Sequence, residues 1–193
     1  MTERSGLDQA AVYIILLNWN SAADTLRCLR ALTLLRGVQA RVVVVDNGSE
    51  PADLERLRSG IARWGLAVEL VETGENLGFG GGCNVGMRLT LERGAEFVWL
   101  LNNDAVPHPE ALQAMLRVMA RDGEVAAVGG GGLASALVQP RACQPPQGLL
   151  CHRLLPPVFV AQCAGDGFRV VGPVLRPFSY SCCVKSATRL GYG

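Results

Sequence analysis

The sequence of 193 residues lacks several features that mark specialised classes of protein. No apolar run reaches about 18 residues, so the sequence predicts no transmembrane helix. None of its seven cysteines forms a Cys-x-x-Cys pair, and two histidines are too few for the usual zinc spacings. The formal net charge is +1 without blocks of like charge, which argues against nucleic-acid binding. The polar start, 1–9, is unlike a signal peptide, so we expect a cytoplasmic protein with free thiols.

Acidic residues are almost absent from the last third of the chain. Sixteen of the seventeen Asp and Glu residues come before Val125, and only Asp166 follows it. The same stretch holds seven of the ten prolines and five of the seven cysteines. Such a shift marks a boundary, and the sequence predicts a folded domain at 11–129 followed by an atypical Pro- and Cys-rich tail at 130–193. We expect that tail to be disordered or an out-of-frame translation, which would leave the fold truncated or altered in its C-terminal third.

Apolar, β-branched runs alternate with segments that carry apolar residues at helical spacing. Strands are expected at 12–17, 41–45, 68–71, 96–101 and 125–128. Helices are expected from the capping residue Ser21 to Gly37, and at 51–64, 79–93 and 109–121. This alternation predicts an α/β fold with a mostly parallel sheet and helices on both of its faces.

Four polar clusters each follow a predicted strand. They occupy residues 18–20, 46–49, 76–78 and 102–104. Because ligands of such sheets bind beyond the carboxyl ends of the strands, we expect these clusters to meet at one edge and to form the site.

Each cluster has a functional and a purely structural interpretation. A carboxylate directly after a buried strand, such as Asp104, suits a divalent cation that bridges phosphates, but it also suits a helix cap. Asp46 either accepts a hydrogen bond from a nucleobase or forms its own turn. Asn18, Trp19 and Asn20 either bind and stack on a base or cap the next helix.

The glycine-rich segment at 76–86 has neither a Walker A loop nor a complete Gly-x-Gly-x-x-Gly motif. It also follows the third predicted strand and not the first, which disfavours a dinucleotide-binding fold. Its small residues allow close approach of the backbone either to a ligand or to a neighbouring strand.

In their order and spacing, the four clusters resemble glycosyltransferase family 2. The matching segments are Asn18-Trp19-Asn20, the element 45–49, Asn76-Leu77-Gly78 with Asn84-Val85-Gly86, and Asn102-Asn103-Asp104. The variants at 18–20 and 102–104 look like those of the rhamnosyltransferase branch. The resemblance covers about 12–129 and implies the GT-A fold.

The resemblance also implies a set of site residues and partners. The nucleotide-sugar site would comprise Asn18, Trp19, Asn20, Asp46, Asn76, Gly78, Asn84, Asn102 and Asn103. Within it, Asn18, Trp19 and Asp46 would contact the nucleobase, and 102–104 the ribose and diphosphate. Asp104 would bind Mg²⁺ or Mn²⁺, whereas Asn102 replaces the first acid of the metal motif. The donor would be a dTDP- or UDP-linked sugar, and the acceptor a glycan or lipid-linked molecule at the inner face of the membrane, where the protein would associate peripherally.

The expected activity is metal-dependent, inverting transfer of a sugar. Members of the family continue beyond the metal motif with an acceptor-binding segment and a catalytic carboxylate, and here only Asp166 remains as an acid. No catalytic base is assigned. A non-catalytic nucleotide-binding remnant is the alternative. A nucleotidyltransferase is disfavoured because no glycine-rich, basic loop follows the first strand.

Overall fold

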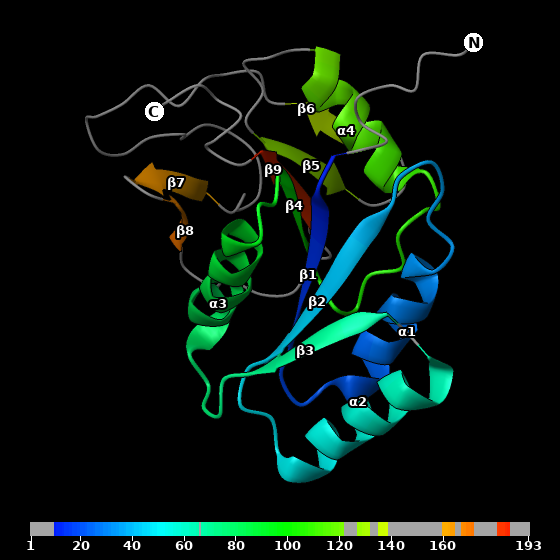
Figure 1. The fold of residues 1–193 in the computed structure, drawn as a ribbon, viewed down its shortest axis with the longest axis vertical. Coiled ribbons are helices and arrows are strands. Elements are labelled where there is room, and N and C mark those ends of the chain that lie inside the picture. The colour runs from blue at the N-terminus through cyan, green and yellow to red at the C-terminus, as the bar shows by residue number, and fades with distance from the viewer. Residues whose placement is uncertain are drawn as a thin grey trace.

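A mixed sheet of seven strands forms the centre of the structure (Figure 1). The structure is a computed structural model, and it describes residues 10–65, residues 67–121 and five strands beyond them. The strands of this sheet are β1 (Val12–Asn18), β2 (Ala40–Asp46), β3 (Val68–Glu72), β4 (Phe97–Leu101), β5 (Ala127–Gly131), β6 (Ser135–Val138) and β9 (Ser181–Lys185). Their order is β3-β2-β1-β4-β9-β5-β6. A separate antiparallel pair consists of β7 (Val160–Ala164) and β8 (Gly167–Val171).

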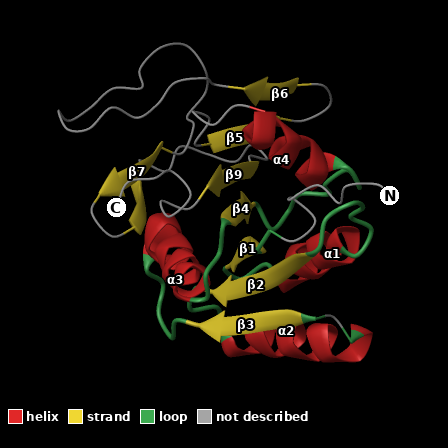
Figure 2. Ribbon diagram, turned by 45° about the horizontal axis from the view of Figure 1, so that its top comes forward, coloured by secondary structure: helices red, strands yellow, loops and turns green. Residues whose placement is uncertain are grey.

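The first four strands are parallel to one another, and helices cover both faces of the sheet. The described helices are α1 (Ala22–Leu32), α2 (Pro51–Trp64), α3 (Gly78–Glu92) and α4 (Ala111–Arg121). Figure 2 shows α3 on one side of the strands and α1, α2 and α4 on the other. The sequence-based prediction of a mostly parallel α/β sheet with helices on both faces is confirmed.

Two apolar cores lie on the two faces, and β1 contributes alternate residues to each. Ile14 and Leu16 belong to the core shared with α1, α2 and α4. Tyr13 and Ile15 belong to the core shared with α3. Because successive side chains of a strand point to opposite faces, the continuous apolar run of β1 is what a strand buried on both sides requires.

Two predicted helices differ from the structure at their ends. The first ends at Leu32 and not near Gly37, because the chain turns at Thr33, whose hydroxyl donates to the Arg30 carbonyl oxygen over 2.7 Å. The backbone N–H of Arg36 then donates to the Pro109 carbonyl oxygen over 2.8 Å. The last predicted helix begins at 111 instead of 109, since the segment before it is a turn.

Four described strands, β6 to β9, lie in the part of the chain predicted to be an atypical tail. One of them, β9, is antiparallel to both of its neighbours and lies between β4 and β5 in the main sheet. The fifth predicted strand, at 125–128, overlaps β5 only in part. The remainder of 130–193 lies outside the described residues, so the domain boundary and the altered reading frame stay predictions.

Two glycines let α3 approach the sheet closely. A Cβ atom at Gly82 would lie 2.4 Å from Leu17 Cδ1 and 3.1 Å from Asn47 Cγ. At Gly86 it would lie 2.8 Å from Ile15 Cγ2 and 3.1 Å from Val45 Cγ2. The small residues of this segment therefore serve the close approach of the helix to β1 and β2, which was one of the two uses that the sequence left open.

This packing predicts that Gly86→Ala destabilises the protein. On an exposed helix face the change would stabilise by about 1 kcal/mol. Here the added methyl group meets β-branched side chains in a filled core, and we expect a loss of about 1–3 kcal/mol of unfolding free energy in urea titrations. Arg88→Ala, on an exposed position of the same helix, is the control and should change stability by less than about 0.5 kcal/mol. Equal or greater stability of Gly86→Ala would contradict the close packing.

Candidate functional site

The carboxyl ends of β1, β2 and β4 meet at one edge of the sheet. Asn18 is paired in register with Asp46, and Leu16 with Leu101. The Asn18 carbonyl oxygen accepts a 2.8 Å hydrogen bond from the Asn47 backbone N–H. Three of the predicted polar clusters therefore start side by side, as the sequence indicates.

The side-chain amide of Asn18 is the centre of the hydrogen-bond network at this edge. It is fully buried. Its Nδ2 lies 2.8 Å from Asp46 Oδ1, 3.2 Å from Asp53 Oδ2 and 3.1 Å from Ser49 Oγ. Two carboxylates thus share one amide nitrogen, and its N–H groups offset the repulsion between them. The same nitrogen joins the end of β1 to the turn after β2 and to α2.

Asp46 closes its own turn. Its Oδ1 accepts a 2.6 Å hydrogen bond from the Ser49 hydroxyl, and its Oδ2 accepts a 3.1 Å hydrogen bond from the Ser49 backbone N–H. The residue is 1% exposed. These contacts are those of a turn-forming aspartate. Asp46 therefore forms its own turn, as one of its two interpretations predicts, and its contact with a nucleobase stays a prediction.

Asp53, which the sequence patterns did not single out, caps α1. Both of its carboxylate oxygens lie within hydrogen-bond distance of the Ala22 backbone N–H, at 3.1 and 3.2 Å. Ser21 occupies the N-cap position, but its side chain makes no cap hydrogen bond. The capping residue therefore comes from the first turn of α2. Spacing along the chain does not reveal it, because the two partners are remote in sequence.

Trp19 and Asn20 follow β1 at the surface. The Trp19 side chain is 54% exposed. Asn20 has a φ of 51°, a left-handed conformation that asparagine tolerates better than most residues. Its Oδ1 accepts a 2.7 Å hydrogen bond from the Glu50 backbone N–H, and its own N–H donates to Ser49 Oγ over 2.9 Å. These bonds fix the backbone on both sides of the turn and leave the Trp19 indole at the surface beside the buried network.

Asn47 holds the glycine-rich loop to the end of β2, a role that the sequence did not assign to it. Its Nδ2 donates to Asn76 Oδ1 over 3.0 Å, and its Oδ1 accepts from the Leu77 N–H over 3.1 Å. The Gly78 N–H donates to Asn76 Oδ1 over 2.8 Å, with φ of 72° at Gly78. Asn76 and Gly78 thus lie together at this edge, whereas Asn84 lies further along α3 and is half-buried.

The segment after β4 is attached to α1. Asn103 Nδ2 lies 2.6 Å from Ser21 Oγ and 2.9 Å from Thr25 Oγ1. The carbonyl oxygen of Asn102 lies 3.7 Å from the Cys28 sulfur. Burial and, after it, the negative charge of Asp104 raise the pKa of the Cys28 thiol to about 12, so this thiol is neutral and unreactive at neutral pH.

Asp104 is exposed, and its side chain makes no hydrogen bond or ion pair with the residues that the structure describes. Over the same residues, no group of three His, Cys, Asp or Glu side chains gathers into a metal cage. A magnesium-type cation commonly takes one or two carboxylates and completes its shell with phosphate oxygens and water. A lone carboxylate at the sheet edge fits that mode of binding, whereas the described residues form no cage made entirely of protein ligands.

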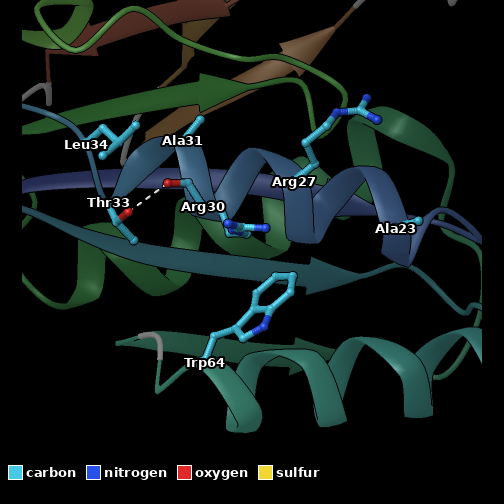
Figure 3. Close-up of a pocket in the computed structure, with 7 residues that line it drawn as sticks. All are labelled: Ala23, Arg27, Arg30, Ala31, Thr33, Leu34 and Trp64. Atoms are coloured by element: carbon cyan, nitrogen blue, oxygen red, sulfur yellow. Dashed lines mark hydrogen bonds between the residues drawn. The ribbon is translucent and has the colours of Figure 1, made fainter.

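A surface cavity adjoins this edge. It has a volume of about 410 Å³ and is lined by Asn20, Glu50, Ala52, Asp53 and Arg56. A second surface cavity, of about 530 Å³, lies between α1 and α2, where the Arg30 guanidinium stacks on Trp64 at 5.3 Å from the ring centre (Figure 3). None of the predicted site residues lines this second cavity, so it is separate from the polar edge.

A family model covers most of the residues that form this edge. Residues 13–136 match the family described as glycosyl transferase family 2. The chain belongs to this family. No curated protein matches the chain. Across the described residues, no helix is both long and apolar enough to cross a membrane.

Two solved structures are similar to part of this chain. A mannosyltransferase from Pyrobaculum calidifontis, in complex with GDP-Man and Mn²⁺, matches with a TM-score of 0.51 and 25% identity, over 60% of this chain and 34% of the mannosyltransferase. A fragment of TarS from S. aureus, in complex with UDP-GlcNAc, matches with a TM-score of 0.49 and 22% identity, over 60% of this chain and 33% of that fragment. The chain thus spans about a third of the length of these structures. The first likeness supports the GT-A assignment of the fold.

Removal of the Asp53 carboxylate should destabilise this edge. Asp53→Ala leaves the Ala22 N–H uncapped, which costs about 1–2 kcal/mol of unfolding free energy. The control is Asp24→Ala in the same first turn of α1, where the carboxylate forms a surface ion pair with Arg27 at 2.8 Å. That change should cost less than about 1 kcal/mol. Urea titrations of both variants compare the two costs, and equal losses would show that Asp53 is not the cap.

Proposed function

We propose that this chain binds a nucleoside-diphosphate sugar together with Mg²⁺ or Mn²⁺ and takes part in inverting transfer of the sugar to a glycan or lipid-linked acceptor. The observation that carries the proposal is the edge at which the exposed Trp19 and the exposed Asp104, which has no side-chain partner among the described residues, flank one buried hydrogen-bond network. Membership of the glycosyl transferase family 2 supports the reaction class.

The nucleobase would lie on the side of β1 and β2. The exposed Trp19 indole offers a face for stacking, and Asn20 lies beside it on the wall of the adjoining cavity. Asn18 and Asp46 are buried beneath these residues and hold the turn in place. We also propose that the nucleobase donates a hydrogen bond directly to Asp46. Because Asp46 is buried in its turn, this contact requires the turn at 46–49 to open toward the ligand.

The ribose and diphosphate would lie on the side of β4, at 102–104. Asp104 would hold the divalent cation, which offsets the negative charge of the diphosphate leaving group when bound. The mannosyltransferase from Pyrobaculum calidifontis was solved with a nucleotide sugar and Mn²⁺, which supports this combination of ligands. Asn76, Gly78 and Asn84 complete the proposed set from the side of α3.

Inverting transfer would proceed by attack of an acceptor hydroxyl oxygen on the anomeric carbon, while the bond from that carbon to the diphosphate oxygen breaks on the opposite face. A base takes the hydroxyl proton. We assign no base, because no acceptor site is identified among the described residues and none of their acids can be assigned to one. Nucleotide binding without transfer is therefore the second candidate function, with the same site and the same ligands.

The metal role of Asp104 predicts a specific loss in nucleotide binding. Binding of UDP, GDP and dTDP to the full chain is measured by calorimetry in Mn²⁺ and again in EDTA. Asp104→Asn keeps the shape of the side chain and removes its charge, so the gain in affinity from Mn²⁺ should fall about 10-fold or more. Glu110→Gln, also at an exposed acid after β4, is the control and should keep the gain. An unchanged metal response of Asp104→Asn would refute the assignment.

The stacking role of Trp19 predicts a graded loss of affinity. Trp19→Phe retains an aromatic face and should bind the best of these nucleotides nearly as well as the natural chain. Trp19→Ala should lose about 1–3 kcal/mol of binding free energy, the usual contribution of one stacked base. Trp64→Ala serves as a control, because Trp64 is also exposed but lies at the separate cavity between α1 and α2. Equal binding by Trp19→Ala and Trp19→Phe would rule out stacking.

A third measurement separates transfer from binding alone. Release of nucleoside diphosphate from UDP-, GDP- and dTDP-linked sugars, rhamnose donors included, is followed with and without acceptor extracts. Turnover that depends on Mn²⁺ and on Asp104 supports the transferase, and the preferred donor tests the rhamnosyltransferase-like branch. Tight, metal-dependent binding without turnover favours the second candidate.

A further inference from the structure

A buried threonine hydroxyl joins the two halves of the proposed site. Thr25, on α1, is fully buried. Its Oγ1 lies 2.6 Å from Asn18 Oδ1 and 2.9 Å from Asn103 Nδ2. Asn18 belongs to the base side, at the end of β1, and Asn103 belongs to the metal side, directly before Asp104. One hydroxyl group is therefore the direct bridge between the two amides.

The direction of every hydrogen bond in this bridge is determined by the carboxylates behind Asn18. The carboxylates of Asp46 and Asp53 accept hydrogen bonds, also from the Ser49 and Ala22 N–H groups, so the Asn18 nitrogen faces them and its oxygen faces Thr25. The Thr25 hydroxyl must then donate to Asn18 Oδ1. A hydroxyl has one proton, so toward Asn103 it can only accept, and the Asn103 nitrogen must be the donor.

This polarity leaves Asn103 with a defined face for a ligand. Its Nδ2 carries two N–H groups, which reach Thr25 Oγ1 and Ser21 Oγ. Its Oδ1 makes no hydrogen bond within the described residues. Asn103 can therefore offer an incoming nucleotide sugar only an acceptor, which suits a sugar hydroxyl or a cation and does not suit a phosphate oxygen.

The more common use of a threonine on a helix is weaker here. A helical threonine often returns its hydroxyl to a carbonyl of the preceding turn. Thr25 lies 3.3 Å from the Ser21 carbonyl oxygen, further than the 2.6 Å to Asn18 Oδ1. The hydroxyl of Thr90 on α3, which is equally buried, donates in that common way, to the Met87 carbonyl oxygen over 3.0 Å. Thr90 thus provides a matched comparison.

We propose that Thr25 is a positioning residue: its hydroxyl holds the Asn103 amide nitrogen inward, so that the Asn103 oxygen and the adjacent Asp104 are set for the sugar nucleotide and its cation. The proposal rests on the proposed function, since its consequence is a larger increase in nucleotide affinity when Mn²⁺ is present. Partners that orient metal-binding groups typically change metal affinity by about 10–100-fold when removed.

The first measurement uses the full chain without ligand. Thr25→Val keeps the shape of the side chain and removes the hydroxyl, whereas Thr25→Ser keeps the hydroxyl. Hydrogen exchange of the Asn103 side-chain amide, followed by ¹⁵N NMR, should be slow in the natural chain and in Thr25→Ser. It should be at least about 10-fold faster in Thr25→Val. Thr90→Val and Thr90→Ser should leave this exchange unchanged.

The second measurement is the ratio of nucleotide affinities in Mn²⁺ and in EDTA for the same variants, with UDP, GDP and dTDP as probes. Thr25→Val should reduce this ratio about 10-fold or more, and Thr25→Ser should restore it. Thr90→Val, even with an equal drop in melting temperature, should retain the ratio of the natural chain.

The outcomes separate the two proposals. Unchanged Asn103 exchange in Thr25→Val, or an affinity ratio that follows melting temperature across both threonine positions, overturns the positioning role. Failure of the natural chain to bind any of the three nucleotides overturns the proposed function, and the exchange measurement still decides whether Thr25 orders Asn103.

Discussion

The edge of this sheet depends on one buried amide placed between two carboxylates. The buried Asp46 and the half-buried Asp53 approach the same Asn18 nitrogen, whose N–H groups lie between the two carboxylates. Without this amide the two carboxylates would face each other with no donor between them, although Ser49 still donates to Asp46 and the Ala22 N–H to Asp53. Since Asp53 also caps α1, the same contact sets where that helix begins. The end of one strand, the turn after the next strand and the starts of two helices are thereby mutually fixed.

A second constraint comes from the other face. Because Gly82 and Gly86 let α3 lie almost against β1 and β2, the loop before that helix comes within reach of the Asn47 side chain. Asn47 then holds this loop much as Asn18 holds the opposite side. Asn18, the last residue of β1, and Asn47, the residue directly after β2, thus direct their side-chain amides toward opposite layers of the fold. Asn18 is in register with Asp46, so Asn47 is one residue further along and its side chain points to the opposite face of the sheet. The small residues of α3 bring the loop before that helix close enough for the hydrogen bond from Asn47 to Asn76.

The sequence indicates what is periodic or local, and the structure adds what is remote. Strand positions, the parallel order of the first four strands and the gathering of clusters at one edge follow from apolar runs and their spacing. Asp53 and Thr25 cannot be found by such reasoning, because each is an ordinary helix residue until a remote partner, Asn18 for Asp53 and Asn103 for Thr25, is brought to it. Asp46 shows the converse: the turn chemistry that its neighbours indicate is present, although the family resemblance points to ligand contact. The place of β9 in the sheet could not be predicted from its own five residues, because its antiparallel partner β4 lies far away along the chain and β-strand formation depends strongly on such context.

Burial divides the site residues of the edge into two physical classes, and this division governs how mutants can be interpreted. Four buried residues, Asn18, Thr25, Asp46 and Asn47, are linked by hydrogen bonds, so a substitution that removes one of these bonds disturbs the edge as well as any ligand contact. Trp19 and Asp104 are exposed, and their side chains can be altered with little effect on the network beneath them. Loss of binding in a variant of Asp46 would therefore not identify a base-reading residue, because the Ser49 turn and the Asn18 amide would be disturbed together. A loss confined to the exposed pair, with stability retained, is the observation that reports on the ligand itself.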